Sequence, residues 1–293
     1  MEKRREKTMD ISWKPDEITL VEDVRIAPYR AMTKAAQLYQ EQRVVVCEGA
    51  KVVRRVLQSS LAMASFLATE RYYEEMHDLL SAKIERGELA PERCFVAERS
   101  VMNAIVGYKL HEGVLAMAHA PQEQNLYDES RTIALPAVLL NGVVDSENIG
   151  AIVRNCVAFG IPSLIIDDTT SSPYLRRAVR VSLGAVFGLS VYRSFDILTD
   201  LAELKQTRGA QVIVAETHPK ARTVSGFSFP PNYVLVLGSE GYGCSENVVS
   251  IADEIVSIAM QPSLHADFAV NSLNVAASSA IILHEAQMAR GKE

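Results

Sequence analysis

The chain has 293 residues and a net charge of −6, and 48% of the residues are hydrophobic, with 15 glycines and 11 prolines. This balance excludes a disordered or low-complexity protein, and a size of roughly 100 to 200 residues per domain suggests two domains. The acidic total disfavours a protein that coats nucleic acid through bulk electrostatics.

Residues 1–117 are predicted to form a small α/β domain. The charged start, MEKRREKTMD, precedes no apolar run of the roughly 20 residues that a membrane span needs, so a cytoplasmic protein without membrane contact is expected. Apolar periodicity predicts strands at 43–49, 64–70, 94–98 and 113–120, and helices at 31–42, 50–59 and 71–87.

Residues 118–134 lose this periodicity and collect polar side chains, which predicts a linker. The second domain is expected over residues 135–293. Its strands are predicted at 136–144, 163–168, 211–216, 233–238 and 254–260, and its helices at 149–159, 174–186, 197–207 and 271–288. Short apolar runs separated by helices predict an α/β fold with a largely parallel sheet covered on both faces.

Charge is unevenly distributed along the chain. Residues 1–60 hold 12 Lys+Arg against 9 Asp+Glu, whereas residues 61–134 hold 7 against 12. A surface for nucleic acid is therefore expected to be local. Its candidates are Arg30, Arg176, Arg177 and Arg180.

Neither a disulfide framework nor a metal site is expected. No two of the four cysteines form a CxxC pair, so they are interpreted as buried, reduced thiols. The cysteines are Cys47, Cys94, Cys156 and Cys244. His218, His265 and His284 do not have the spacing of metal ligands.

Ligands of open parallel sheets bind beyond the carboxyl ends of the strands, and three loops in such places are unusual. In the first, NGVVDSENIGAIVRNCVAFG, Asn148 stands at a helix start, where capping alone explains it. Arg154 interrupts an otherwise apolar helix face, so we expect a buried guanidinium with partners.

The second loop, LVLGSEGYGCSENV, follows an apolar strand and holds three glycines and Glu240. Glycines let the backbone approach a ligand closely, although a tight turn also explains them. The GxxGxG spacing departs from the dinucleotide-binding GxGxxG, and no acidic residue ends a second strand at the expected distance, which disfavours a nucleotide-dependent oxidoreductase. The absence of a GxSxG motif disfavours a serine hydrolase.

The third loop lies in IVSIAMQPSLHADFAVNSLNVAASSAIILHEA and leads into a helix that opens with Asn271, Ser272 and Asn274. Taken alone, this is a capped helix with a small-residue face. His265 and Asp267, which precede it, are interpreted as solvated loop residues.

Together, these segments resemble a known family. NIGAIVRNCVAFG is similar to the first motif of the SpoU family of RNA 2′-O-ribose methyltransferases, LVLGSEGYG to the second and SLNVAASSAIILHE to the third. RRAVRVSLGAVFGLSV resembles the stretch that this family carries after its first motif. The resemblance covers roughly residues 136–286, and the N-terminal part is more loosely similar to the small RNA-substrate-binding domain often fused ahead of it.

The resemblance implies the fold and cofactor of the SPOUT superfamily. It implies a deep trefoil knot that holds S-adenosylmethionine, with a cradle made by Leu237, Gly238, Ile258, Met260 and Leu273. We expect glycine at position 238 because a side chain there would obstruct the cofactor. The cofactor supplies the methyl group, so no metal is implied.

The resemblance also implies a set of catalytic residues. These are Asn148, Arg154, Glu240, Ser272 and Asn274. Arg154 is expected to hold the RNA phosphate and stabilise the developing alkoxide, and either that phosphate or an arginine of lowered pKa accepts the proton. Asn148 would orient Arg154 or the ribose, Glu240 would support the cradle or Arg154, and Ser272 with Asn274 would fix the loop and the substrate.

A homodimer and an RNA partner complete the expectation, with ribosomal RNA favoured over transfer RNA. The sequence departs from the family pattern at Ala259, where proline is common, and in a longer loop before Ser272. The alternative is a non-catalytic RNA-binding protein on the same knotted fold. Retention of the five candidate catalytic residues disfavours that alternative.

Overall fold

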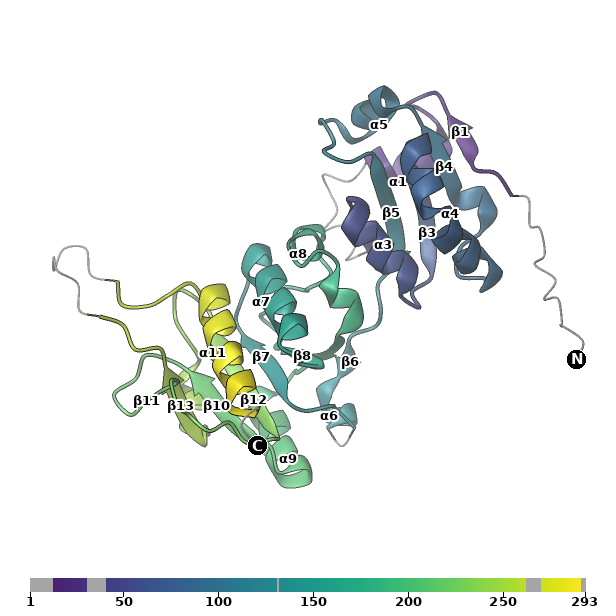
Figure 1. The fold of residues 1–293 in the computed structure, drawn as a ribbon. Coiled ribbons are helices and arrows are strands. Elements are labelled where there is room, and N and C mark those ends of the chain that lie inside the picture. Colours follow the sequence, from purple (N-terminus) through teal and green to yellow (C-terminus); the bar gives the residue numbers. More distant parts are fainter. Residues whose placement is uncertain (1–12, 31–40, 131, 262–269, 291–293) are drawn as a thin grey trace, which may run out of the picture.

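The computed structural model describes residues 13–30, 41–130, 132–261 and 270–290, which form two sheets with their helices (Figure 1). Most of the helix predicted at 31–42 lies outside the described residues, and so do His265 and Asp267. No helix of the described part is long and apolar enough to cross a membrane.

The N-terminal sheet has five strands in the order β1-β4-β3-β5-β2. β1, β4 and β3 are mutually parallel, while β5 pairs antiparallel with both β3 and β2. The strands are β1 (Asp16–Ile18), β2 (Val44–Glu48), β3 (Met63–Ala68), β4 (Cys94–Ala97) and β5 (Val114–His119). The helices are α1 (Ala27–Arg30), α3 (Ala50–Gln58), α4 (Glu70–Glu85) and α5 (Arg99–Val106), with 3₁₀ turns at Val24–Ile26 and Pro91–Arg93.

The second sheet has eight strands in the order β11-β13-β10-β12-β7-β8-β9-β6, and every pairing in it is parallel. The strands are β6 (Gln124–Asn125), β7 (Ala137–Asn141), β8 (Ser163–Ile166), β9 (Ser190–Arg193), β10 (Gln211–Ala215), β11 (Arg222–Thr223), β12 (Tyr233–Gly238) and β13 (Glu254–Ser257). The helices are α6 (Leu126–Glu129), α7 (Ser146–Ala158), α8 (Arg176–Val181), α9 (Ile197–Arg208), α10 (Glu246–Ser250) and α11 (Val275–Arg290), with a 3₁₀ turn at Ala185–Gly188. The predicted parallel α/β fold is confirmed.

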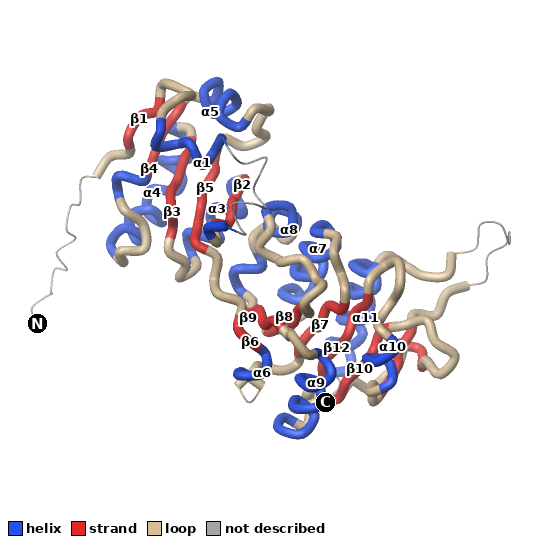
Figure 2. The backbone as a smooth tube through the Cα atoms, turned by 180° about the vertical axis from the view of Figure 1, so that it is seen from behind, coloured by secondary structure: helices blue, strands red, loops and turns tan. Residues whose placement is uncertain are grey.

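Both faces of the eight-stranded sheet are covered, as the apolar runs predict. Val138 and Leu140 of β7 share one core with α7, α8 and α11, whereas Ala137 and Leu139 share another with α9 and α10. Alternate residues of a strand point to opposite faces, so a strand buried on both sides needs a continuous apolar run. Figures 1 and 2 show α7 and α11 side by side over β7 and β12, with α9 on the other face.

Close packing fixes the position of α7. Asp145 caps this helix by accepting hydrogen bonds from the backbone N–H of Glu147 at 2.6 Å and of Asn148 at 3.1 Å. A Cβ on Gly150 would lie 2.6 Å from the carbonyl oxygen of Ala178 in α8. Glycine at position 150 therefore lets α7 and α8 touch at the backbone.

Several elements differ from the sequence prediction. The helix predicted at 174–186 ends at Val181 because Leu183 and Gly184 adopt positive φ angles of 54° and 76°. The last helix begins at Val275, after a cap by Asn274, rather than at Asn271. The strand β9 and the helix α5 were not predicted.

The stretch 118–134, predicted as a linker, also carries structure. It includes the end of β5, strand β6 and helix α6. β6 pairs with β9 at the edge of the eight-stranded sheet, and part-buried Glu123 forms an ion pair of 2.7 Å with Arg193. Two-residue strands carry almost no periodic signal, so the polar composition of this segment concealed its contacts.

The two sheets meet through α3, β2 and α8. Arg176 of α8 forms an ion pair with Glu48 at 2.6 Å and donates to the hydroxyl of Tyr108. Arg55 of α3 donates to the carbonyl oxygen of Leu183 at 2.9 Å. These contacts join the N-terminal sheet to the helix that follows β8.

Candidate active site at the carboxyl edge of the parallel sheet

Three of the four segments that build the candidate site follow the neighbouring strands β10, β12 and β13, and the fourth is the start of α11. β12 lies between β10 and β7, and β13 lies beyond β10. Because all these strands are parallel, their carboxyl ends meet along one edge of the sheet. The loops that the sequence singled out are therefore brought together by topology.

The glycine-rich loop after β12 closes on itself. Ser239 and Gly243 exchange backbone hydrogen bonds of 3.1 and 2.8 Å. A Cβ on Gly238 would lie 2.2 Å from the backbone nitrogen of Cys244, so no side chain fits there. A side chain would collide with the returning loop itself, so the structure adds a second reason for glycine at this position.

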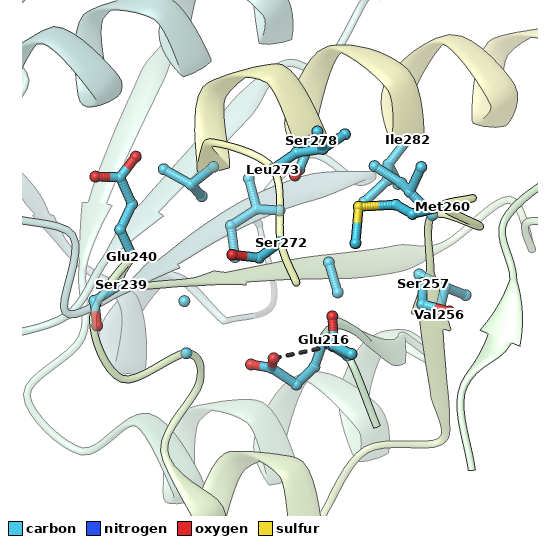
Figure 3. A pocket seen from close by; sticks show the side chains of 17 residues that line it. Glu216, Ser239, Glu240, Val256, Ser257, Met260, Ser272, Leu273, Ser278 and Ile282 are labelled. Carbon is cyan, nitrogen blue, oxygen red and sulfur yellow. Dashed lines mark hydrogen bonds between the residues drawn. The ribbon is translucent and has the colours of Figure 1, made fainter. Parts of the chain in front are cut away.

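A pocket opens between this loop, β10, β13 and α11 (Figure 3). All five residues predicted for the cradle line it, together with Glu240 and Ser272 from the predicted catalytic set. The cradle residues are Leu237, Gly238, Ile258, Met260 and Leu273. In Figure 3, Glu240 lies at one end of the pocket and Met260 with Ser257 lies at the other.

The rim of the pocket holds a hydrogen-bonded cluster of three predicted residues. The amide nitrogen of Asn274 donates to Oδ1 of Asn148 at 2.9 Å and to a carboxylate oxygen of Glu240. Because Asp145 caps α7, the side chain of Asn148 is free to accept this bond. We name Asn148, Glu240 and Asn274 the asparagine cluster. It joins the three resembling motifs through one amide group.

Arg154 lies apart from the asparagine cluster, and the expectation that it is buried was wrong. It is exposed, and its side chain makes no hydrogen bond or ion pair with the described residues. It lies six positions after Asn148, which corresponds to about 9 Å along a helix axis. α7 packs on α8 at Gly150 and on α11 at Asn155, whose amide donates to Ser279 at 2.8 Å. Arg154 occupies the side of α7 that neither neighbour covers.

The candidate RNA-binding arginines have different surroundings. Arg176 is part-buried and paired with Glu48, so its charge serves the junction between the sheets. Arg30 donates to backbone oxygens, including that of Asp23 at 3.2 Å, and Arg177 pairs with Glu147 on the surface. Arg180 is exposed and has no ion pair in the described part of the chain.

Glu216 is a pocket residue that sequence reasoning missed. It follows the last residue of β10, and its carboxylate accepts hydrogen bonds from the backbone N–H of Thr217 at 2.9 Å and of Cys244 at 3.0 Å. The rule that ligands bind beyond the carboxyl ends of parallel strands pointed to this position, because Glu216 ends the apolar run QVIVA.

A second missed group, Asn141 and Asp167, stands behind the loops. Asp167 is buried and accepts from the amide of Asn141 at 2.8 Å and from the backbone N–H of Gly142 at 3.0 Å. The other end of the Asn141 amide accepts from the backbone N–H of Ser245 at 2.8 Å. This pair therefore ties the loops after β7, β8 and β12 to one another.

The prediction for the cysteines is confirmed: all four are buried and free. Burial raises the pKa of Cys244 to about 12, and the nearby carboxylate of Glu216 adds to this shift. Among the described residues, no three His, Cys, Asp or Glu side chains are placed to share a metal ion.

Comparison with known proteins agrees with this geometry. An uncharacterized tRNA/rRNA methyltransferase of Mycobacterium bovis is 29% identical over 274 residues, which cover 90% of this chain and 88% of that protein. A 23S rRNA (guanosine-2′-O-)-methyltransferase of Acinetobacter baylyi is 25% identical over 197 residues, covering 65% of this chain and 76% of the relative.

The fold is shared with a crystal structure of an AdoMet-bound rRNA methyltransferase from Sinorhizobium meliloti. The TM-score is 0.77 at 21% identity, and the match covers 93% of this chain and 97% of the other. The model of the SpoU rRNA methylase family matches residues 136–284, which is just over half of the chain and includes all four segments of the site. The chain belongs to the SpoU rRNA methylase family.

Proposed function

We propose that the protein transfers a methyl group from S-adenosylmethionine to a ribose 2′-hydroxyl of RNA. The observation that carries this proposal is the convergence of five cradle residues on one pocket whose rim holds the asparagine cluster. The names of the relatives support it, because the Acinetobacter protein is a 23S rRNA (guanosine-2′-O-)-methyltransferase by name and the Sinorhizobium structure holds AdoMet.

The lining of the pocket fits this cofactor. The side chains of Leu237, Ile258 and Leu273 offer apolar surface of the kind that an adenine ring needs. The described lining residues include two carboxylates, Glu216 and Glu240, and no lysine, arginine or histidine. A pocket with acidic groups and no cationic side chain suits a ligand whose reactive centre is a positively charged sulfonium.

The asparagine cluster would position the ribose for attack. S-adenosylmethionine, when bound, supplies an electrophilic methyl group. Asn148 and Glu240 both accept from Asn274, so their orientations are fixed before RNA arrives, and a site fixed in advance aligns reactants at low entropic cost. Ser272, exposed at the pocket wall, would contact the ribose or phosphate.

Arg154 would contribute charge rather than accept a proton. Its exposed guanidinium offers several N–H donors in a planar fork, so it can hold an RNA phosphate and stabilise a developing alkoxide. Arg177 and Arg180 lie on the adjacent α8 and extend this basic surface towards the N-terminal sheet. We therefore propose RNA as the partner, with ribosomal RNA favoured, and the N-terminal sheet as its docking unit.

We further propose a homodimer and a trefoil knot. Exposed apolar residues on the paired helices α7 and α11, Val157, Ile281 and Met288, give a second copy a surface to cover. Ile281→Glu should then yield a monomer in sedimentation experiments. The knot is supported by the path of the chain, which crosses from β13 beyond β10 back to α11 beside α7.

The test is methyl transfer from labelled S-adenosylmethionine to ribosomal and transfer RNA, read out as 2′-O-methylated nucleosides after digestion. Ser278→Phe fills the pocket from α11 and should abolish cofactor binding in calorimetry. Gln287→Phe, exposed on the same helix, is the matched control and should bind normally. Gly238→Trp is unsuitable, because it would displace the loop backbone.

Three results decide the matter. Binding and transfer that Ser278→Phe abolishes would support the proposal. Cofactor binding without transfer to any RNA would contradict the choice of substrate. A folded wild-type protein that binds no cofactor would refute the enzyme and favour a non-catalytic RNA-binding protein.

A further inference from the structure

The side chain of Glu216 lies in the pocket and is hydrogen-bonded to the glycine-rich loop after β12. Its two carboxylate oxygens accept hydrogen bonds from the backbone N–H of Thr217 at 2.9 Å and of Cys244 at 3.0 Å. A Cβ on Gly243 would lie 2.3 Å from Oε2 of Glu216, so the glycine leaves room for the carboxylate. The loop 239–244 and the end of β10 therefore fix the orientation of this side chain.

The carboxylate retains acceptor capacity towards the pocket. A carboxylate has about four lone-pair sites, and the two backbone bonds use one on each oxygen. In Figure 3 Glu216 lies across the pocket from Leu273 and Ser278, with Ser239 and Glu240 to one side. A ligand with two adjacent hydroxyl groups would give each oxygen a second donor.

The position along the pocket distinguishes Glu216 from Glu240. Glu240 belongs to the asparagine cluster at the rim, where the reacting methyl group must lie in the proposed reaction. The apolar residues Leu237, Ile258 and Leu273 supply the surface for a base. Glu216 directly follows β10, on a different wall from Glu240, so its reach suits the sugar that connects the base to the reacting group.

On the basis of the proposed function, we propose that Glu216 binds the 2′- and 3′-hydroxyl groups of the cofactor ribose. A carboxylate that accepts from a ribose hydroxyl is a recurrent device in nucleotide sites. The backbone N–H groups of Thr217 and Cys244 offset part of the negative charge of Glu216. The remaining lone pairs of the carboxylate can then accept hydrogen bonds from neutral hydroxyl groups. Glu216 is thereby a specificity residue that selects ribose over deoxyribose in the cofactor.

The test measures binding by calorimetry and needs no turnover. The ligands are S-adenosylhomocysteine and its 2′-deoxy and 3′-deoxy analogues, and the proteins are the wild type, Glu216→Gln and Glu246→Gln. Glu246 is an exposed carboxylate in α10, so its variant controls for the change in charge. One hydrogen bond to a charged group is worth about tenfold or more in affinity.

The wild type and Glu246→Gln should bind each deoxy analogue about tenfold more weakly than S-adenosylhomocysteine. Glu216→Gln should bind S-adenosylhomocysteine about tenfold more weakly and should discriminate little between it and the analogues, because the hydroxyl groups have lost their partner. Should Glu216→Gln fail to fold, Glu216→Asp tests the same point. It keeps the charge, but its shorter side chain moves the carboxylate away from the hydroxyl groups.

Two outcomes would overturn the inference and leave the proposed function intact. Equal binding of all three ligands by the wild type would show that the hydroxyl groups are not recognised. A variant that binds more weakly yet still discriminates as the wild type does would show that Glu216 only supports the loop. No binding of any ligand by the wild type would refute the inference and the proposed function together.

Discussion

The amide of Asn274 makes two kinds of contact, and one substitution separates them. Its oxygen accepts from the backbone N–H of Ala276 at 2.9 Å and of Ala277 at 3.2 Å, which caps α11. Its nitrogen donates to Asn148 and Glu240 in the asparagine cluster. Asn274→Asp keeps an oxygen for the cap and replaces the donor, whereas Asn274→Ala removes both.

The expected changes in stability follow from these contacts. Loss of the cap in Asn274→Ala should lower the free energy of unfolding by about 1 kcal/mol. Asn274→Asp keeps the cap, and its charge suits a helix N-terminus, but it loses exposed hydrogen bonds and places a like charge near Glu240, which in water costs about 1 kcal/mol at 4 Å. We therefore expect Asn274→Asp to be destabilised by no more than about 1 kcal/mol in urea unfolding at neutral pH.

Methyl transfer should respond differently from stability. Without the donor, Asn148 and Glu240 are no longer held together, and misplacement of about 1 Å in a site costs roughly 100-fold in rate. Asn274→Asp should therefore be folded and about 100-fold less active. The double variant Asn274→Asp with Glu240→Gln reverses donor and acceptor, so it should recover the lost stability. Wild-type activity in folded Asn274→Asp would refute the role of the cluster and leave Asn274 as a helix cap.

Three further predictions concern packing and burial. Gly150→Ala should lower the free energy of unfolding by about 1 to 3 kcal/mol, because its Cβ would meet the backbone of α8 at 2.6 Å, whereas Gly188→Ala, with open space around it, should change thermal unfolding little. Arg176→Met removes the part-buried ion pair with Glu48 between the two sheets, so it should destabilise the protein and expose residues 119–124 to protease. Arg177→Met breaks only a surface ion pair and should lower the free energy of unfolding by less than about 1 kcal/mol. The pKa of about 12 for Cys244 leaves little thiolate at pH 8, so it should react with a thiol reagent on the order of 1000-fold more slowly in the folded protein than in urea.

The strands that were predicted well are those buried on both faces. Residues 233–238 form β12 as expected, because every residue there is buried and the run is continuously apolar. β9 was missed because its sequence, SVYR, contains an exposed serine and an arginine whose guanidinium reaches Glu123. A short strand next to the edge strand gains its stability from contacts distant in sequence, and local periodicity does not record these.

The site was predicted in part for a related reason. Motif resemblance identified the residues that line the pocket, but it gave the wrong burial for Arg154. α7 contacts two helices, so two sides of it are covered and a third is open, and the apolar residues around Arg154 do not reveal which. Val157, one of the apolar residues of this helix, is itself 42% exposed. The exposed apolar side chain and the exposed arginine share that open side.

Structural and functional explanations of a polar residue at a helix start are not alternatives in this site. Asp145 caps α7 and thereby leaves the side chain of Asn148 to the cluster, whereas Asn274 uses one end of its amide as a cap and the other as a donor. Glu216 likewise supports a loop with one lone pair on each oxygen and faces the pocket with the others. A substitution to alanine removes both contributions together. Exchanges between amide and carboxylate replace a hydrogen-bond donor with an acceptor, or the reverse, and preserve the shape of the side chain. They therefore separate the contribution to folding from the contribution to chemistry at Asn274 and Glu216.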